Sequence, residues 1–171
     1  MQMLERSSIL WNYLPSDIRG LIEDGEKLVE FAQTSGSHGA TDFSYIVFPF
    51  SKAYEGFLKR FFLDLDIIKE DEYYGDDIRI GRILNPTFMV EKQNIFEKLC
   101  SLPEGDKKLA EGLWMAWRHG RNQVFHYFPH NFRRLTFEDA FAIIQELLTA
   151  MNTAVEGCKL RVVKPHVETI V

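Results

Sequence analysis

The sequence predicts an all-α protein of one domain, built as an antiparallel bundle of four to five helices. Three observations carry this prediction. Apolar residues recur with helical spacing over most of the chain, capping patterns precede several of these stretches, and the 171 residues suffice for one ordinary core. Hydrophobic residues make up 46% of the chain and charged residues 26%, which is typical of a folded domain. We expect the domain to span residues 1–157 and a tail to span residues 158–171.

The first half of the chain predicts two long helices. A proline–serine pair begins the first, which spans about residues 15–33. The second spans about residues 41–68, and Pro49 within it should bend the helix or mark its first turn. Residues 69–86 combine an acidic stretch with the run IRIGRIL. For that segment we expect an acidic loop, followed by a short strand or an irregular insertion.

The second half predicts one short and two long helices. Residues 91–100 form the short one, and residues 107–127 form the first long one. Thr136, with Asp139 three residues later, is a capping box that begins the last helix. Gly157 ends that helix, because glycine favours the backbone conformation found just past a helix C-terminus.

Composition excludes several classes of protein. The chain has 20 Lys and Arg against 25 Asp and Glu, so a general nucleic-acid coat protein is excluded, whereas a local basic patch is not. Cys100 and Cys158 form no CxxC motif, and no signal peptide is visible, so we expect a reducing, cytoplasmic environment. The most apolar stretch, residues 43–50, is too short to span a membrane. No metal-binding or cofactor-binding motif is present, and no cofactor is expected.

Residues 112–137 form a local basic patch. This window holds four arginines, three of the five histidines and no Asp or Glu. Two tryptophans, Trp114 and Trp117, lie near its start. Basic, histidine-rich and aromatic residues together on an acidic protein indicate a candidate polyanion site. The alternative is a helix whose charges are simply solvated.

An ideal helical projection at about 100° per residue divides residues 107–127 into two faces. The core stripe consists of Leu113, Ala116, Trp117, Gly120 and Val124. Trp114 and Phe125 lie among the polar residues opposite. Large aromatic residues on a non-core face usually contact a second surface, which is either another helix of the bundle or another subunit.

The segment from Arg121 to His126 carries the most specific pattern, R-N-x-x-x-H, near the end of a predicted long helix. This pattern resembles the motif of the HEPN superfamily, all-α bundles whose ribonuclease members carry an Arg and a His separated by four to six residues. An acidic residue on an earlier long helix recurs in that family, and Glu55 matches it here. Residues 51–59 and the motif are most similar to the HEPN domain of RNase LS-type toxins of bacterial toxin–antitoxin systems. The resemblance covers residues 40–157.

The resemblance implies a catalytic set of Arg121, Asn122, His126 and Glu55. His126 would act as general acid and base, since a histidine exchanges its proton near neutral pH. Arg121 would bind the scissile phosphate, and Asn122 would hold either the phosphate or His126. Glu55 would orient Arg121 or tune His126. The structural alternatives are an ion pair between Arg121 and Glu55, and solvated pairs of Glu55 with the neighbouring lysines.

Together, the residues and the resemblance predict a metal-independent endoribonuclease, a toxin or defence enzyme that cleaves RNA through attack by the RNA's own 2′-hydroxyl. Five further residues are expected to contact the substrate: Arg118, Tyr127, His130, Arg133 and Arg134. The expected partners are RNA, a second copy of the chain bound through residues 107–127, and an antitoxin-like protein. The alternative is a non-catalytic HEPN-like module that docks RNA or an antitoxin-like protein.

Overall fold

The computed structural model confirms the all-α prediction. It describes residues 1–34, 40–75, 77–88, 95–101 and 107–158, and within these ranges all regular secondary structure is helical. Residues 159–171, which the sequence assigns to a tail, lie outside the described ranges.

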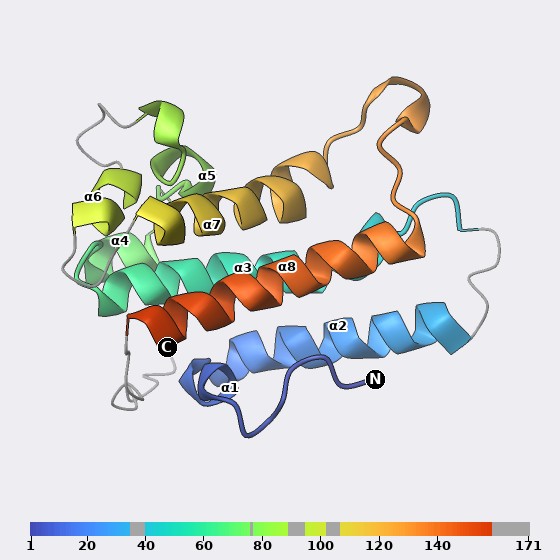
Figure 1. Cartoon of the computed structure of the whole chain (residues 1–171), viewed down its shortest axis with the longest axis horizontal. Helices are drawn as coiled ribbons and strands as arrows, with labels where there is room; N and C mark the ends of the chain where they lie inside the picture. Colours follow the sequence, from blue (N-terminus) through green and yellow to red (C-terminus); the bar gives the residue numbers. More distant parts are fainter. Residues whose placement is uncertain (35–39, 76, 89–94, 102–106, 159–171) are drawn as a thin grey trace.

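Four long helices form the bundle: α2 (Ser16–Thr34), α3 (Ser44–Asp64), α7 (Lys107–Trp117) and α8 (Phe137–Gly157). Figure 1 shows α2 and α7 running in one direction and α3 and α8 in the other, so consecutive long helices are antiparallel. None of the helices in the described ranges is long and apolar enough to cross a membrane.

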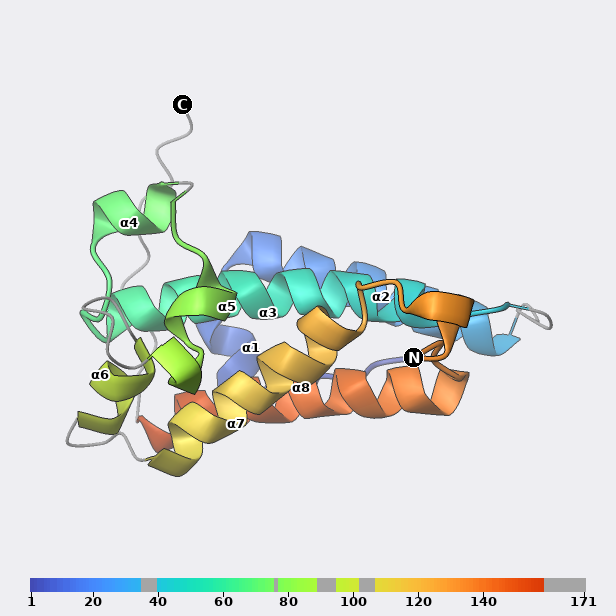
Figure 2. The same ribbon diagram turned by 90° about the horizontal axis from the view of Figure 1, so that it is seen from above.

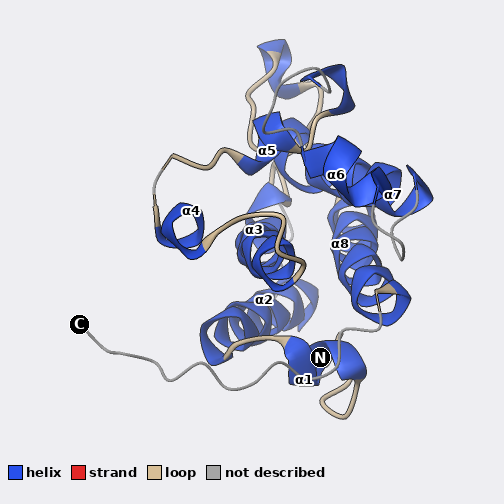
Figure 3. Cartoon of the chain, turned by 90° about the vertical axis from the view of Figure 1, so that its left-hand side faces the viewer, coloured by secondary structure: helices blue, strands red, loops and turns tan. Residues whose placement is uncertain are grey.

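Helix α3 is the central element of the bundle. It packs against both α2 and α8, and α7 covers α8 (Figure 3). Four phenylalanines of α3 are almost completely buried: Phe50, Phe57, Phe61 and Phe62. Burial of each such ring stabilises the fold by about 1.5–3 kcal/mol relative to leaving it exposed, so α3 supplies a large share of the core.

Shorter helices gather at the end of the bundle where α3 ends and α7 begins (Figure 1). They are α4 (Glu70–Tyr74), α5 (Ile80–Ile83), a 3₁₀ turn (Pro86–Phe88) and α6 (Ile95–Ser101). Helix α6 overlaps the short helix expected over residues 91–100, of which residues 91–94 lie outside the described ranges.

The prediction of an acidic loop and a strand or irregular insertion over residues 69–86 is wrong in part, because the described residues form α4 and α5. The buried pair in the IRIGRIL run is Ile80 and Leu84, which are four residues apart. That spacing places both side chains on one face of a helical turn, whereas a strand buries alternate residues. In the acidic stretch, the Glu72 carboxylate accepts a hydrogen bond from the Lys69 backbone N–H at 2.9 Å and begins α4.

The N-terminal segment carries a helix that the sequence analysis did not identify, α1 (Ile9–Tyr13). This segment is fixed by the buried carboxylate of Glu26 on α2. Glu26 accepts hydrogen bonds from the Met3 backbone N–H at 2.8 Å and from the Arg6 guanidinium at 2.6 Å. Burial alone would raise the pKa of Glu26, but these bonds outweigh it and hold the pKa below its ordinary value.

The boundaries of two predicted helices agree well with the structure. Helix α2 matches the helix expected over residues 15–33. At the start of α8, Thr136 and Asp139 form the predicted capping box, with the Thr136 hydroxyl accepting from the Asp139 N–H at 3.1 Å. The helix expected over residues 41–68 is shorter, because α3 begins at Ser44 and ends at Asp64, with Pro49 in its second turn.

The prediction of a long helix over residues 107–127 is correct for its start and wrong for its last part. Helix α7 ends at Trp117 and continues as a π-helical turn, Arg118–Gln123, which we call the π segment. A π turn is wider than an α turn, so the ideal projection no longer gives the directions of the residues that follow. His126 consequently lies beyond the end of the helix, in a bend.

Gly120 holds the π segment against the bundle. The buried Ser51 hydroxyl on α3 donates a hydrogen bond to the Gly120 carbonyl. On its other side Gly120 contacts Leu147 of α8, and a Cβ at this position would lie 2.6 Å from the Leu147 Cδ2. Tyr54, one turn after Ser51, donates from its hydroxyl to the Leu113 carbonyl at 2.9 Å, so α3 holds both α7 and the π segment.

We expect Gly120→Ala to lower the free energy of unfolding by about 1–3 kcal/mol, because the added methyl overpacks the buried Leu147. Gly112→Ala is the matched control, since that glycine is also helical but has open space around its Cβ position. The control should be neutral or stabilising by about 0.5–1 kcal/mol. Urea unfolding of both variants tests the packing, and equal stabilities would contradict it.

Candidate functional site

One cavity brings together all four residues of the predicted catalytic set. Its volume is about 570 Å³, and we call it the motif cavity. Its lining comes from α3 and from the segment that runs from the end of α7 to the bend: Phe48, Ser51, Lys52, Glu55, Trp117, Arg121, Asn122, Phe125 and His126. Residues far apart in the sequence thus meet at one place.

An ion pair between Arg121 and Glu55 spans the motif cavity. Arg121 Nη1 donates to Glu55 Oε2 at 2.8 Å, and the guanidinium lies 5.0 Å from the centre of the Trp117 ring. Among the ion pairs of the described residues, Glu55 joins Arg121 and neither Lys52 nor Lys59. The two side chains keep 41% and 30% of their surface exposed, so the pair contributes about 0–1 kcal/mol to stability. Its main effect is to orient Arg121.

The aromatic residues of the predicted non-core face behave differently from one another. Trp114 is half-buried and packs against the hydrophobic core, so another part of the bundle covers it. Phe125 is exposed and packs edge-to-face on Phe48 of α3, with ring centres 5.7 Å apart. Phe48 and Phe125 therefore form an exposed aromatic rim beside the motif cavity.

The motif cavity offers groups suited to a phosphodiester. The Arg121 guanidinium has five N–H donors, and Glu55 engages Nη1, so donors remain for phosphoryl oxygens. Asn122 adds an amide, and His126 adds an exposed imidazole that can take up and release protons. In the described part of the chain, no three His, Cys, Asp or Glu side chains converge in a way that could hold a metal ion.

The predicted substrate contacts do not line the motif cavity. Arg118, Tyr127 and His130 are exposed outside it. Arg133 and Arg134 line a second cavity of about 510 Å³, which also involves α8. Its full lining is His119, Gln123, Val124, Arg133, Arg134, Leu135, Ile143 and Glu146, and we call it the second cavity.

The second cavity contains a pair that the sequence analysis missed. His119 Nδ1 lies 3.0 Å from both carboxylate oxygens of Glu146. The two residues are 27 positions apart and lie on different elements, so no local sequence pattern identifies them as partners. The only sequence signal for this pair is that His119 lies in the histidine-rich window of residues 112–137.

The segment that connects the motif to α8 lies at the end of the bundle where α3 and α8 begin (Figure 2). Asp42 fixes this segment. Its carboxylate accepts hydrogen bonds from the Ser44 N–H at 2.9 Å, the Leu135 N–H at 3.3 Å and the Asn131 amide at 3.2 Å. Burial alone would raise the pKa of Asp42, but these bonds outweigh it and hold the pKa below its ordinary value.

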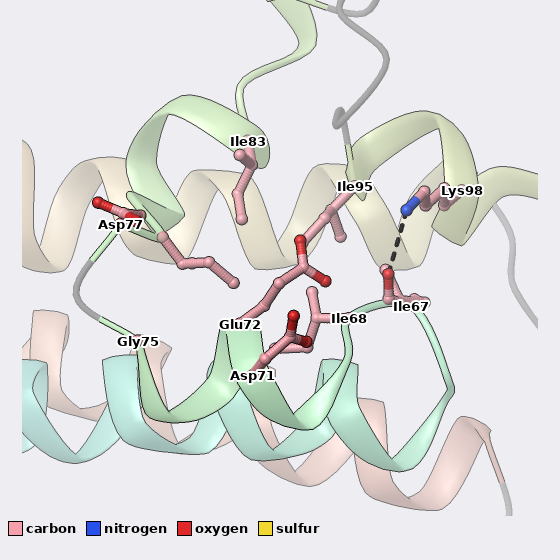
Figure 4. A pocket seen from close by; sticks show the side chains of 10 residues that line it. Ile67, Ile68, Asp71, Glu72, Gly75, Asp77, Ile83, Ile95 and Lys98 are labelled. Carbon is pink, nitrogen blue, oxygen red and sulfur yellow. Dashed lines mark hydrogen bonds between the residues drawn. The ribbon is translucent and has the colours of Figure 1, made fainter.

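A cavity of a different character lies among the short helices (Figure 4). Its volume is about 280 Å³, and isoleucines and carboxylates from α4 and its neighbours line it. Lys98 donates from Nζ to the Ile67 carbonyl at 3.1 Å at its edge. None of the predicted site residues lines this cavity.

No family model, curated protein or solved structure matches the chain. The functional hypothesis consequently rests on the residues of the cavities and on their geometry.

We expect Asp42→Asn to lower the free energy of unfolding at pH 7 by about 1.5–3 kcal/mol, the range for hydrogen bonds to a charged group. Because folding lowers the pKa of Asp42, its contribution is complete above the unfolded pKa, about 3.9, and is lost as the pH falls through the folded pKa. The difference between wild type and variant should therefore shrink below about pH 4. Urea unfolding at several pH values measures it, with the exposed Asp77→Asn as control, and a constant difference would contradict the role of Asp42.

Proposed function

We propose that this protein is a metal-independent endoribonuclease of the HEPN type. The observation that carries the proposal is the motif cavity, in which Arg121, Asn122, His126 and Glu55 meet from two separate helical segments. A cavity with a guanidinium, an amide and an exposed imidazole suits a scissile phosphodiester. No carboxylate other than Glu55 lines it, and Glu55 is paired with Arg121.

In this proposal the RNA supplies its own nucleophile. The 2′-hydroxyl attacks the adjacent phosphorus, and the bond from phosphorus to the 5′-oxygen breaks. His126 takes the 2′-proton or returns a proton to the departing 5′-oxygen. Arg121 and Asn122 stabilise the charge that develops on the phosphoryl oxygens. Glu55 is a positioning residue: it orients Arg121 and does not itself contact the phosphate.

One His126 cannot be base and acid in the same step, so we further propose that two copies of the chain face each other across the site. The exposed rim of Phe48 and Phe125 beside the motif cavity supports this arrangement, since an aromatic pair left in water is a common element of an interface. The contact region thus includes α3 as well as the bend that follows the π segment.

A non-catalytic docking module is the second candidate, and the Arg121–Glu55 ion pair is the observation that favours it. A guanidinium that already contacts a carboxylate has part of its charge compensated, as in a purely structural pair. Such a module would bind RNA or an antitoxin-like protein without cutting RNA. Cleavage assays separate the two candidates directly.

We expect the purified protein to cut single-stranded RNA, and His126→Ala and Arg121→Ala each to reduce the rate at least about 100-fold. Glu55→Gln should have a smaller effect, because Glu55 positions Arg121 and does not react. Melting temperatures should hardly change, since the Arg121 pair is exposed. The control is Arg79→Ala, which removes an exposed arginine outside the motif cavity. A wild-type protein that binds RNA and leaves it intact would favour the docking module.

The products test the chemistry. Cleavage should persist in excess EDTA and give a 2′,3′-cyclic phosphate and a 5′-hydroxyl, and a single 2′-deoxy substitution should protect the site where it lies. Mass spectrometry identifies the ends. A 5′-phosphate, or activity that EDTA removes and magnesium restores, would contradict the mechanism.

We expect Phe48→Glu to weaken self-association at least about 10-fold, since a charge would enter the proposed contact. Phe31→Glu is the matched control, because Phe31 is 57% exposed on α2 and Phe48 is 55% exposed on α3. Light scattering over a concentration series measures the effect. A wild-type monomer at micromolar concentration, or equal behaviour of the two variants, would contradict the dimer.

A further inference from the structure

The π segment separates the two cavities. Arg121 and Asn122 line the motif cavity, whereas the next residue, Gln123, lines the second cavity together with His119. The motif cavity faces α3 and the second cavity faces α8, so the two cavities lie on different sides of the same segment. A single strand that reaches both cavities must pass around this segment.

His119 is held in a defined orientation in the second cavity. Its Nδ1 engages the Glu146 carboxylate at 3.0 Å, and about a third of its side chain is exposed. A carboxylate on one ring nitrogen fixes the ring and leaves the other nitrogen, Nε2, for a ligand. Glu146 in turn is occupied by this contact.

Arg133 is also held in place, and its donors stay accessible. Its guanidinium carbon lies 4.0 Å from the centre of the Phe128 ring and 5.6 Å from that of Phe132. Stacking uses the face of the guanidinium, whereas its N–H donors lie in the plane and point outward. Arg134 follows on the same loop and is exposed, so two cations face the second cavity.

The backbone before these arginines is unusual. His130 and Asn131 both have positive φ, 60° and 48°, a conformation that non-glycine residues rarely adopt and that often accompanies function. The contacts of Asp42 with Asn131 and with the Leu135 N–H hold this turn on the bundle. The arginines are thus presented by a fixed turn.

We propose that the second cavity is a phosphate subsite for single-stranded RNA, taking a phosphate other than the one bound in the motif cavity. Arg133 and Arg134 bind the phosphoryl oxygens, and His119 adds a third contact through Nε2. The ring of Phe132, 66% exposed, offers a face on which a base stacks. Arginines interleaved with exposed aromatic rings are typical of surfaces that bind single strands. This subsite rests on the proposed function, since it places the same RNA strand.

Binding to the uncleaving His126→Ala protein tests the subsite apart from catalysis. Fluorescence anisotropy with a short single-stranded RNA should show affinity at least about 10-fold lower when Arg133→Ala and Arg134→Ala are added. The salt dependence of log K should lose roughly 0.7 per phosphate contact removed. The charge-matched control is Lys107→Ala with Lys108→Ala, which removes two cations where α7 begins, at the other end of that helix. Equal affinities of the two double variants would overturn the subsite.

A local readout places the ligand. In the His126→Ala protein, adenosine 5′-monophosphate should shift the ring resonances of His119 in an NMR titration, and the Arg133→Ala, Arg134→Ala background should abolish the shift. Unchanged His119 resonances at saturation would overturn the subsite. If the His119 resonances do not shift and the wild-type protein still cleaves RNA, only the subsite is contradicted and the proposed function is not. If the wild-type protein does not cleave RNA but the His119 resonances shift, the proposed ribonuclease function is contradicted and the second cavity is still a nucleotide-binding site.

Discussion

The close contact of Gly120 with both α3 and α8 is the constraint on which both cavities depend. Ser51 holds the Gly120 carbonyl from one side, and Leu147 occupies the space of a side chain on the other. The helix can approach this closely only because position 120 has no Cβ. His119 and Arg121 are two positions apart, which places them on opposite sides of a helical turn, so that Arg121 reaches Glu55 on α3 and His119 reaches Glu146 on α8.

The two cavities share one electrostatic arrangement. Each contains a side chain of the π segment that meets one carboxylate from a long helix: Arg121 meets Glu55, and His119 meets Glu146. These pairs are partly exposed and add little stability, so their main effect is to orient the Arg121 and His119 side chains. The protein has a formal net charge of −5 at pH 7, and the window of residues 112–137 supplies no acid of its own. Acids from other helices therefore orient two of its basic groups, while Arg133 and Arg134 face the second cavity as exposed cations.

A rigid scaffold surrounds the irregular segment that carries the chemistry. Helix α3 is anchored by buried phenylalanines and by the Tyr54 hydroxyl, whose pKa burial raises well above its ordinary value, so it stays a neutral donor to the Leu113 carbonyl. Asp42, just before α3, fixes the turn that follows the motif. Functional groups on loops keep their geometry when such contacts limit the loop, and this combination is common in binding and catalytic sites.

The sequence by itself determined the helical class, the extent of α2 and the start of α8, and it grouped four of the residues that line the motif cavity. The helical elements follow from local patterns, which are apolar spacing and a capping box at Thr136. The grouping of Arg121, Asn122 and His126 follows from their motif, and Glu55 joined them through the family resemblance. Only the tertiary structure decided the π segment, the helical turn at Ile80 and Leu84, and the pairing of His119 with Glu146. Each depends on which residues come into contact after the helices pack. His119 and Glu146, for example, are 27 positions apart in the sequence. A periodic pattern records which face of a helix is apolar, whereas the partner on the opposite helix is set by the packing of the whole bundle.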